Sequence, residues 1–457
     1  MNLTKELDAL LAMVDQSVEE IVDLHQELVR IPSVNTGSMP TGDEIEVCRN
    51  LDQRFRREGI ASEVIETAPR RGNLLASLGT AQSPSILFMS HTDVVPAGDE
   101  ARWTYPPFSA ELHDGKVYGR GSDDAKSVVT SGAMTLLVLK RAGMPLRGRL
   151  VFLAAADEEA GGTYGVRWLV ENVPEKVRTD YALNEGGGSP IWVNGTLGYV
   201  FDTGEKGRSV ATFTATGLAA HAAQPWLGDN AIEKIAELVS RLRSYRPTLD
   251  TSLPFFEQVV RLLELENPIT PANVDDIADH LIETYPDLSS TIRALSRMTV
   301  SPTLITGGIK SNSIPEACSV TCDVRNLPHQ PLTYVEAEMA QVVDGLGSIS
   351  LKLEHTAIPS MSPADSRFVR QVKEATRLSL GRGDLAWLQA ITVGFTDSRF
   401  MRSLGTEVYG FAPLAPSADP VRRAHAVDEA MEVDSLILRV KMQVALAYLL
   451  LRRASDA

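Results

Sequence analysis

Three apolar, strand-forming runs in the first two hundred residues end in histidine or carboxylate side chains, and this placement constrains the fold most. The run SILFMSHTDVV delivers His91 and Asp93 at its end and breaks at Pro96. The other two runs end in DEEAGG and NEGGG, and a glycine-rich turn, GRGSDDAKS, opens a helix with two further aspartates. A lone carboxylate at such a position is usually a turn or helix cap. The repetition instead predicts that these side chains meet at one edge of a sheet.

The pattern of the runs predicts an α/β fold. Extended segments that are apolar throughout, alternating with helical segments, are typical of a mostly parallel sheet flanked by helices on both faces. In such sheets ligands bind where the strands end.

The sequence pattern changes near residue 206, where the predicted strands alternate apolar and polar residues. It predicts a small α+β domain with a sheet open on one face. We therefore expect a catalytic domain in two parts, residues 1–205 and 358–457. An inserted domain is expected at 206–357, itself carrying a helical insertion at about 246–298.

Composition limits the classes of partner. A formal net charge of −15 and a pI near 5.1 argue against nucleic acid and anionic membrane as partners. No run reaches the roughly 18 apolar residues of a membrane-spanning helix. The acidic, helix-periodic N-terminal segment does not resemble a secretory signal. Three cysteines, Cys48, Cys318 and Cys322, form no disulfide framework, so we expect a reducing, cytoplasmic location.

The polar residues at the strand ends predict a metal site. The inventory comprises His91, Asp93, Asp123, Asp124, Asp157, Glu158, Glu159, Glu185 and, far downstream, His425. Carboxylates gathered at one edge would repel one another unless cations lay between them. Mixed imidazole and carboxylate ligands suit zinc, manganese or cobalt better than calcium.

Eight motifs in register resemble one known family. They read SHTDVVPAG, GRGSDDAKS, DEEAGG, NEGGG, GLAAHAAQP, GGIKSNSIP, CDVRNLP and AHAVDE. In this order they resemble the di-zinc metallopeptidases, which include aminoacylase, acetylornithine deacetylase, succinyl-diaminopimelate desuccinylase, glutamate carboxypeptidase and carnosine-type dipeptidases. The likeness is nearest to the carboxypeptidase-S and aminoacylase branch. It implies a zinc-peptidase-like α/β domain with an inserted α+β (ferredoxin-like) domain for dimerisation or lid closure.

The resemblance also implies a role for each motif residue. His91 and Glu185 would bind one zinc, Glu159 and His425 the second, and Asp124, two residues before Lys126, would bridge them. Asp93 would hold the second ring nitrogen of His91, and Glu158 would be the general base. His221 would reach the active site of the neighbouring subunit in a homodimer and stabilise the oxyanion. The implied cofactor is two Zn²⁺ per subunit, with Co²⁺ or Mn²⁺ also accepted. Ser127 and Ala426 depart from the family pattern without removing a ligand.

The expected reaction follows from this set of residues. A hydroxide bridging two cations would attack the amide carbonyl of an N-acyl amino acid or short peptide with a free carboxylate. Asn312 and Arg325 are expected to bind the substrate, although Arg325 has a surface salt bridge as its alternative role. The segment GFTDSRFMR adds Thr396, Asp397 and Arg399 as candidates for substrate contact.

Two alternatives remain open. The enzyme could be a dipeptidase or carboxypeptidase, or the chain could be a catalytically silent metal-binding protein. The other histidines, His25 among them, are expected in core or surface positions without catalytic partners.

Overall fold

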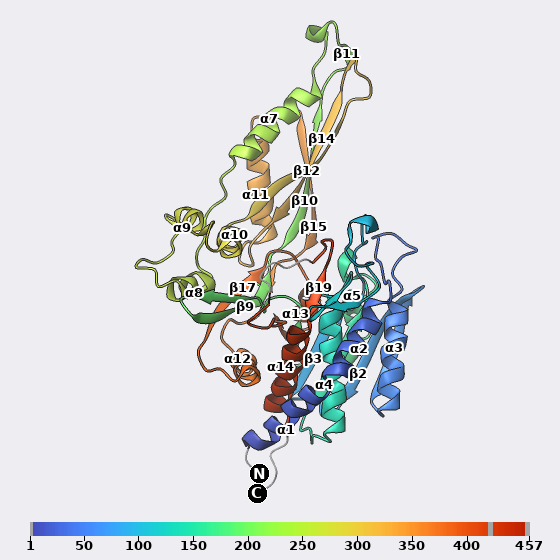
Figure 1. The fold of residues 1–457 in the computed structure, drawn as a ribbon. Coiled ribbons are helices and arrows are strands. Elements are labelled where there is room, and N and C mark those ends of the chain that lie inside the picture. The colour runs from blue at the N-terminus through green and yellow to red at the C-terminus, as the bar shows by residue number, and fades with distance from the viewer. Residues whose placement is uncertain (1–2, 419–423, 453–457) are drawn as a thin grey trace. The chain divides into compact units, whose positions relative to one another are not determined.

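The computed structural model describes residues 3–418 and 424–452, which form two compact units. Unit 1 comprises Met1–Thr203, Ser362–Ala390 and Thr396–Ala457, and unit 2 comprises Gly204–Met361 and Ile391–Phe395. Figure 1 shows the elements of each unit.

The main sheet has ten strands and a parallel centre. The central order is β6 (Arg149–Ala155), β3 (Ser85–His91), β7 (Tyr181–Asn184) and β18 (Glu407–Gly410), and neighbouring strands in this group are parallel. On one side the sheet continues antiparallel through β2 (Arg71–Leu78) and β1 (Ala61–Ala68). On the other side β9 (Thr196–Glu205) pairs with β18, and further short strands pair with β9, namely β8 (Pro190–Val193), β16 (Ser360–Met361) and β17 (Leu385–Thr392).

Helices cover both faces of this sheet, as the apolar runs predict. Successive residues of β3 enter different cores: Ile86 and Phe88 join one, and Leu87 and Met89 join the other. The larger core is built with α1 (Leu3–Gln16), α2 (Val18–Val29), α3 (Glu44–Arg57), α4 (Lys126–Arg141), α12 (Arg367–Leu380) and α14 (Val433–Leu451). The smaller core uses α5 (Val166–Asn172), α6 (Pro174–Val177) and α13 (Ser398–Ser403). The predicted α/β class, with a mostly parallel central sheet, is confirmed.

Unit 2 contains a four-stranded antiparallel sheet in the order β12, β14, β10, β15. Its chain order is β10 (Arg208–Thr216), α7 (Ala231–Ser244), β12 (Thr299–Gly307), β14 (Ala317–Arg325), α11 (Leu332–Val343) and β15 (Ile349–Ala357). This is the ferredoxin-like arrangement. Alternate residues of β10 and β14 are buried in one core with α7 and α11. Between α7 and β12 lie three more helices, α8 (Pro254–Leu262), α9 (Val274–Leu281) and α10 (Pro286–Leu295).

Two details differ from the sequence predictions. The alternating run ATFTATG predicts a strand that could extend its sheet by pairing with a second copy of the chain, but it belongs to β10, which is paired on both sides by β14 and β15. The strands at the edges of this sheet are β12 and β15. The run DEAMEVDSLILRVKMQVALAYLLLRRA also predicts a last helix that begins at Asp428. Residues Ala430–Glu432 instead form β19, paired with β5 (Lys116–Tyr118), and α14 begins at Val433.

Within residues 3–418 and 424–452, we find no helix that combines the length and the apolar character needed to cross a membrane.

Candidate metal and catalytic site

His91 lies at the carboxyl end of β3 with its imidazole almost fully buried. Its Nδ1 is 2.9 Å from the backbone carbonyl oxygen of Asp93 and 3.5 Å from Oδ1 of the same residue. A carbonyl oxygen only accepts, so Nδ1 carries a hydrogen and Nε2 is the ring nitrogen left for a metal ion. That Nε2 lies 3.1 Å from Oδ1 of Asp124 and 3.1 Å from Oε2 of Glu185.

Asp124 contacts two histidines, one through each of its oxygens. Oδ1 lies beside His91, and Oδ2 lies 3.2 Å from Nε2 of His425. His425 Nε2 is also 3.2 Å from Oε1 of Glu159. The structure thus brings together residues from five segments of unit 1, spread from position 91 to position 425.

A tight turn after β6 presents Glu158 and Glu159. Asp157 begins the turn with a left-handed backbone (φ 70°), and the 3-10 helix Glu158–Ala160 follows. The backbone N–H groups of Glu158 and Glu159 donate to Oδ1 and Oδ2 of Asp93, both at 3.1 Å. The carboxylate of Asp93 therefore orients this turn, besides lying near His91.

The donor atoms of this cluster could hold a divalent cation. Ligand atoms of His91, Asp124 and Glu159 lie within 4.8 Å of one another, and so do those of His91, Glu158 and Glu185. The two groups share His91, and mixed nitrogen and oxygen donors of this kind suit zinc, manganese or cobalt.

The charges of the cluster also favour bound cations. Burial raises the pKa of Glu158 well above its ordinary value, and the neighbouring Glu185 raises it further. Burial would lower the pKa of His91, but Glu185, Asp124 and Asp93 hold it well above the usual range. A buried excess of carboxylates is what cations would neutralise.

Two residues that support this cluster were missed by the sequence predictions. Glu429 is fully buried, and its Oε1 accepts the backbone N–H groups of Asp123 (2.9 Å) and Asp124 (3.0 Å). Its other oxygen pairs with Arg120, whose Nη2 also donates to the backbone carbonyl of His425 at 3.2 Å. The motif AHAVDE contains Glu429, but its position after a histidine gave no sign of this role.

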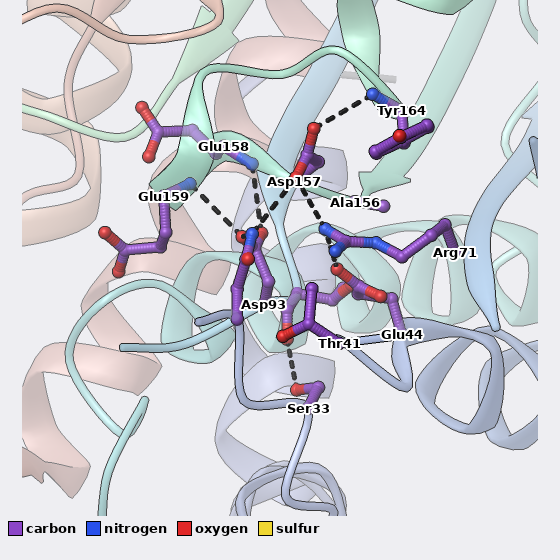
Figure 2. Close-up of polar contacts among 12 residues, drawn as sticks. Ser33, Thr41, Glu44, Arg71, Asp93, Ala156, Asp157, Glu158, Glu159 and Tyr164 are labelled. Atoms are coloured by element: carbon purple, nitrogen blue, oxygen red, sulfur yellow. Dashed lines mark hydrogen bonds and ion pairs between the residues drawn. The ribbon is translucent and has the colours of Figure 1, made fainter. Parts of the chain in front are cut away.

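A buried polar network lies behind the Glu158–Glu159 turn (Figure 2). One nitrogen of Arg71, Nη2, is 2.7 Å from Oε1 of Glu44 and 2.7 Å from Oδ1 of Asp157. The amide of Asn35 donates to Asp93 at 2.8 Å and to Asp157 at 3.1 Å. Arg71, Glu44 and Asn35 lie in no recognisable motif, so the sequence offered no signal for them apart from the charge of Arg71 at the start of a buried strand.

Within unit 2, His221 and Asn312 lie close together. His221 ends the two-residue strand β11 (Ala220–His221), where it pairs with Ser313 of β13 (Ser313–Ile314). The next residue, Ala222, donates its N–H to the carbonyl of Asn312 at 3.1 Å. The exposed His221 ring accepts the N–H of Ala223 at Nδ1, so its hydrogen is on Nε2, which is free to donate.

Arg325 lies at the opposite end of unit 2 from His221. It is the last residue of β14, whose first residue, Ala317, is near Asn312 in sequence, so the two ends are about 26 Å apart at 3.3 Å per residue. Its Nε donates to Oδ1 of Asp323 at 2.7 Å, and its guanidinium lies 5.7 Å from the ring centre of Phe395. Nη1 is buried, and it has no hydrogen-bond partner among residues 3–418 and 424–452.

The GFTDSRFMR segment contributes backbone contacts to the site in unit 1. Arg399 donates to the carbonyl oxygens of Thr396 and Gly161, each at 3.0 Å, and so braces the turn after Glu159. Asp397 is buried, and one of its carboxylate oxygens, packed near Gly162, has no hydrogen-bond partner within the part of the chain that the structure describes.

The fold and this site define a metal-dependent hydrolase, and comparison with known proteins agrees. The model of peptidase family M20/M25/M40 matches residues 87–449, and the chain belongs to that family. It is therefore a hydrolase acting on amide bonds of peptides or acyl-amino acids.

Individual relatives are distant. The chain is 26% identical over 420 residues to a probable succinyl-diaminopimelate desuccinylase of Staphylococcus aureus (strain MRSA252), covering 92% of this chain and 94% of that protein. It is 29% identical over 374 residues to N-fatty-acyl-amino acid synthase/hydrolase PM20D1 of Xenopus tropicalis, and the match covers 79% of this chain and 71% of that protein. Among solved structures, the M20 family metallo-carboxypeptidase Sso-CP2 of Sulfolobus solfataricus superposes with a TM-score of 0.70 at 17% identity, covering 93% of this chain and 98% of the other.

Proposed function

We propose that this protein releases an amino acid from an N-acyl amino acid, or from a short peptide with a free carboxylate, using two divalent cations. The observation that carries the proposal is the position of Asp124, whose two oxygens face His91 and His425 separately. One carboxylate shared in this way would bridge two cations, with Glu185 on the His91 side and Glu159 on the His425 side. Zinc is the proposed metal, and cobalt or manganese would suit the same ligands.

Glu158 performs the proton transfers in this proposal. When bound, the cations supply Lewis acidity that polarises the substrate carbonyl and acidifies water. Glu158 takes a proton from the attacking water and later delivers it to the leaving amine, because its raised pKa suits a group that both accepts and returns a proton. Asp93 keeps Nε2 of His91 available for metal binding and fixes the backbone of the Glu158–Glu159 turn.

The names of the relatives favour an acyl-amino acid over a peptide. The desuccinylase and PM20D1 are both named for an acyl group joined to an amino acid or related compound. Arg325 is proposed to hold the carboxylate of the substrate through Nη1, the part of its guanidinium that Asp323 leaves free. Asn312 is a second proposed substrate contact, and Arg399 acts through the backbone that it braces.

We further propose a homodimer formed through unit 2. The edge strand β12 exposes Leu304 and Ile305, and Ile309 follows it with 96% of its surface exposed. An unpaired, apolar edge is the surface on which a second copy would add its own strand. His221 is then proposed to donate from Nε2 to the oxyanion in the partner's site. The three buried free cysteines favour a reducing compartment, for which we propose the cytoplasm.

A panel assay combined with metal analysis tests the proposed function. We expect turnover of N-acyl amino acids with about two metal ions per chain, and higher rates for free-acid than for amidated C-termini. Glu158→Gln should keep the metal but lower kcat by orders of magnitude, whereas Glu159→Ala should lose metal. Faster cleavage of dipeptides than of acyl-amino acids would identify a dipeptidase, and bound metal without turnover on any substrate would contradict the enzyme assignment.

A further inference from the structure

We propose that Arg71 is a positioning residue that holds the general-base turn in place through Asp157 and Asn35. The proposal rests on the function proposed above, in which Glu158 is the base and Glu159 a metal ligand. Arg71 contacts neither of these side chains, and its effect is transmitted through a closed set of buried hydrogen bonds.

The first step of the argument is the contact between Arg71 and Asp157. Oδ1 of Asp157 accepts from Nη2 of Arg71 at 2.7 Å, and Oδ2 accepts from the backbone N–H of Tyr164 at 3.0 Å. The side chain of Asp157 therefore ties the beginning of the turn to a residue seven positions later. Because Asp157 has φ 70°, its backbone needs such external restraint to stay in the left-handed region.

The second step runs through Asn35 to Asp93. The same amide nitrogen of Asn35 donates to Oδ1 of Asp157 and to Oδ2 of Asp93. Asp93 in turn accepts the N–H groups of Glu158 and Glu159. In Figure 2 the carboxylates of Glu158 and Glu159 point away from Arg71, so the network supports the turn from behind while its side chains remain free for chemistry.

The third step concerns charge. Glu44, Asp93 and Asp157 are three buried carboxylates, and within the described residues Arg71 is the cation that touches two of them. The cluster is closed on one side by Gly42, where a Cβ atom would lie 2.2 Å from Oε2 of Glu44 and 3.0 Å from Cδ of Arg71. Without the guanidinium, Asp157 and Glu44 would face each other in a dry site, and Asp157 would be expected to turn away.

A purely structural ion pair between Arg71 and Glu44 is the alternative. The two roles predict different results when both members are replaced by apolar residues. A purely structural pair should then regain both stability and activity, because a well-packed apolar pair can substitute for a buried ion pair. If Arg71 instead positions Asp157, the same replacement restores stability but not function.

The test compares Arg71→Met with the double variant Glu44→Leu/Arg71→Met, following thermal midpoint, Zn²⁺ affinity, kcat and KM. We expect Arg71→Met to lose stability and activity. The double variant should recover most of the thermal midpoint, yet keep kcat at least tenfold below wild type, with KM within about twofold and Zn²⁺ affinity reduced about tenfold. Arg149→Met is the matched control, since Arg149 begins the strand that ends before Asp157, and kcat and Zn²⁺ affinity should be unchanged in it.

Wild-type kcat and metal affinity in the double variant would overturn the proposal. If the double variant does not fold, Arg71→Lys decides: it keeps the cation and should exceed Arg71→Met in kcat at least threefold at equal metal content, and equal kcat would refute the positioning role. Should wild type itself hydrolyse no substrate, the proposed function fails, while the Zn²⁺ affinities of the same variants still test the role of Arg71.

Discussion

The backbone N–H of Asp124 donates a 3.0 Å hydrogen bond to the buried carboxylate of Glu429. Glu429 comes from the segment that also carries His425, and its partner Arg120 donates to the carbonyl of His425. One buried ion pair thus fixes the distance between two segments that supply proposed ligands to the same cation.

We therefore predict that Glu429→Ala weakens metal binding although Glu429 is not itself a ligand. Removing a partner of this kind typically costs about 10–100-fold in metal affinity or activity. It also leaves Arg120 buried without its counter-ion, which should cost about 3–5 kcal/mol in the free energy of unfolding. Titration of the metal-free protein with Zn²⁺, together with chemical denaturation, measures both effects.

Glu429→Gln should fall between wild type and Glu429→Ala, because the amide oxygen still accepts from the backbone while the charge opposite Arg120 is lost. Glu171, an exposed residue paired with Arg167, provides the control, and Glu171→Ala should change neither quantity. Unchanged Zn²⁺ affinity in Glu429→Ala would show that Glu429 does not support metal binding.

Arg325→Ala is predicted to raise KM for substrates with a free carboxylate and to have little effect on amidated ones. A charge-assisted hydrogen bond is lost only with the former. Asp323→Asn supplies the comparison, since it breaks the ion pair of Arg325 and keeps the guanidinium. If both variants reduce activity equally on both kinds of substrate, Arg325 is a salt-bridge residue and no carboxylate ligand.

His221 is predicted to serve the site of the partner subunit. His221→Ala and Glu158→Ala should each be nearly inactive as pure dimers, and mixing them should restore activity. With random exchange of subunits, half of the dimers are mixed and each has one intact site, so about a quarter of wild-type activity should return. Exchange is checked with differently tagged chains, and confirmed exchange without recovery would assign His221 to its own chain or to no catalytic role.

His25 makes the protein sensitive to acid. Its buried ring lies between Thr130 Oγ1 (3.1 Å) and Ser122 Oγ (2.9 Å), and burial, with the charges of Arg439 and Lys126, lowers its pKa to about 3. Between its unfolded pKa near 6.5 and this value, the unfolded state binds the extra proton. The contribution of neutral His25 to the free energy of unfolding is thus complete above pH 6.5. It is lost at up to about 1.4 kcal/mol per pH unit as the pH falls towards 3.

A variant that cannot be protonated, His25→Gln, should show a shallower decline in the free energy of unfolding between pH 7 and 5. Comparing the slopes of the two proteins cancels the other titrating groups. Parallel curves would show that His25 has an ordinary pKa in the folded protein.

The class of the main sheet could be predicted because its strands are apolar on both faces, and β3 indeed contributes alternate residues to two cores. The clustering of His91 with Glu185 followed from their positions after apolar runs, and that of Asp124 from its glycine-rich turn before a helix. The supporting residues could not be predicted in this way. Arg71, Asn35 and Glu44 act through distances between segments, and a single sequence carries no pattern for a contact of that kind.

The alternating pattern of residues also could not show which strand lies at the edge of the sheet in unit 2. Alternation identified β10 as a strand with one buried face, but every strand of an open sheet alternates in the same manner, whether it lies inside or at the edge. Only the pairing of β10 with both β14 and β15 shows that it has no free side.

The position of β18 sets an order of assembly for the nascent chain. This strand fills the gap between β7 and β9, although it is translated after the whole of residues 204–361. Until β18 is made, the sheet of unit 1 lacks the strand between β7 and β9, whereas residues 204–361, which contain the core of unit 2, are already synthesised. The sheet of unit 1 can therefore be completed only after residues 407–410 have been synthesised, late in translation.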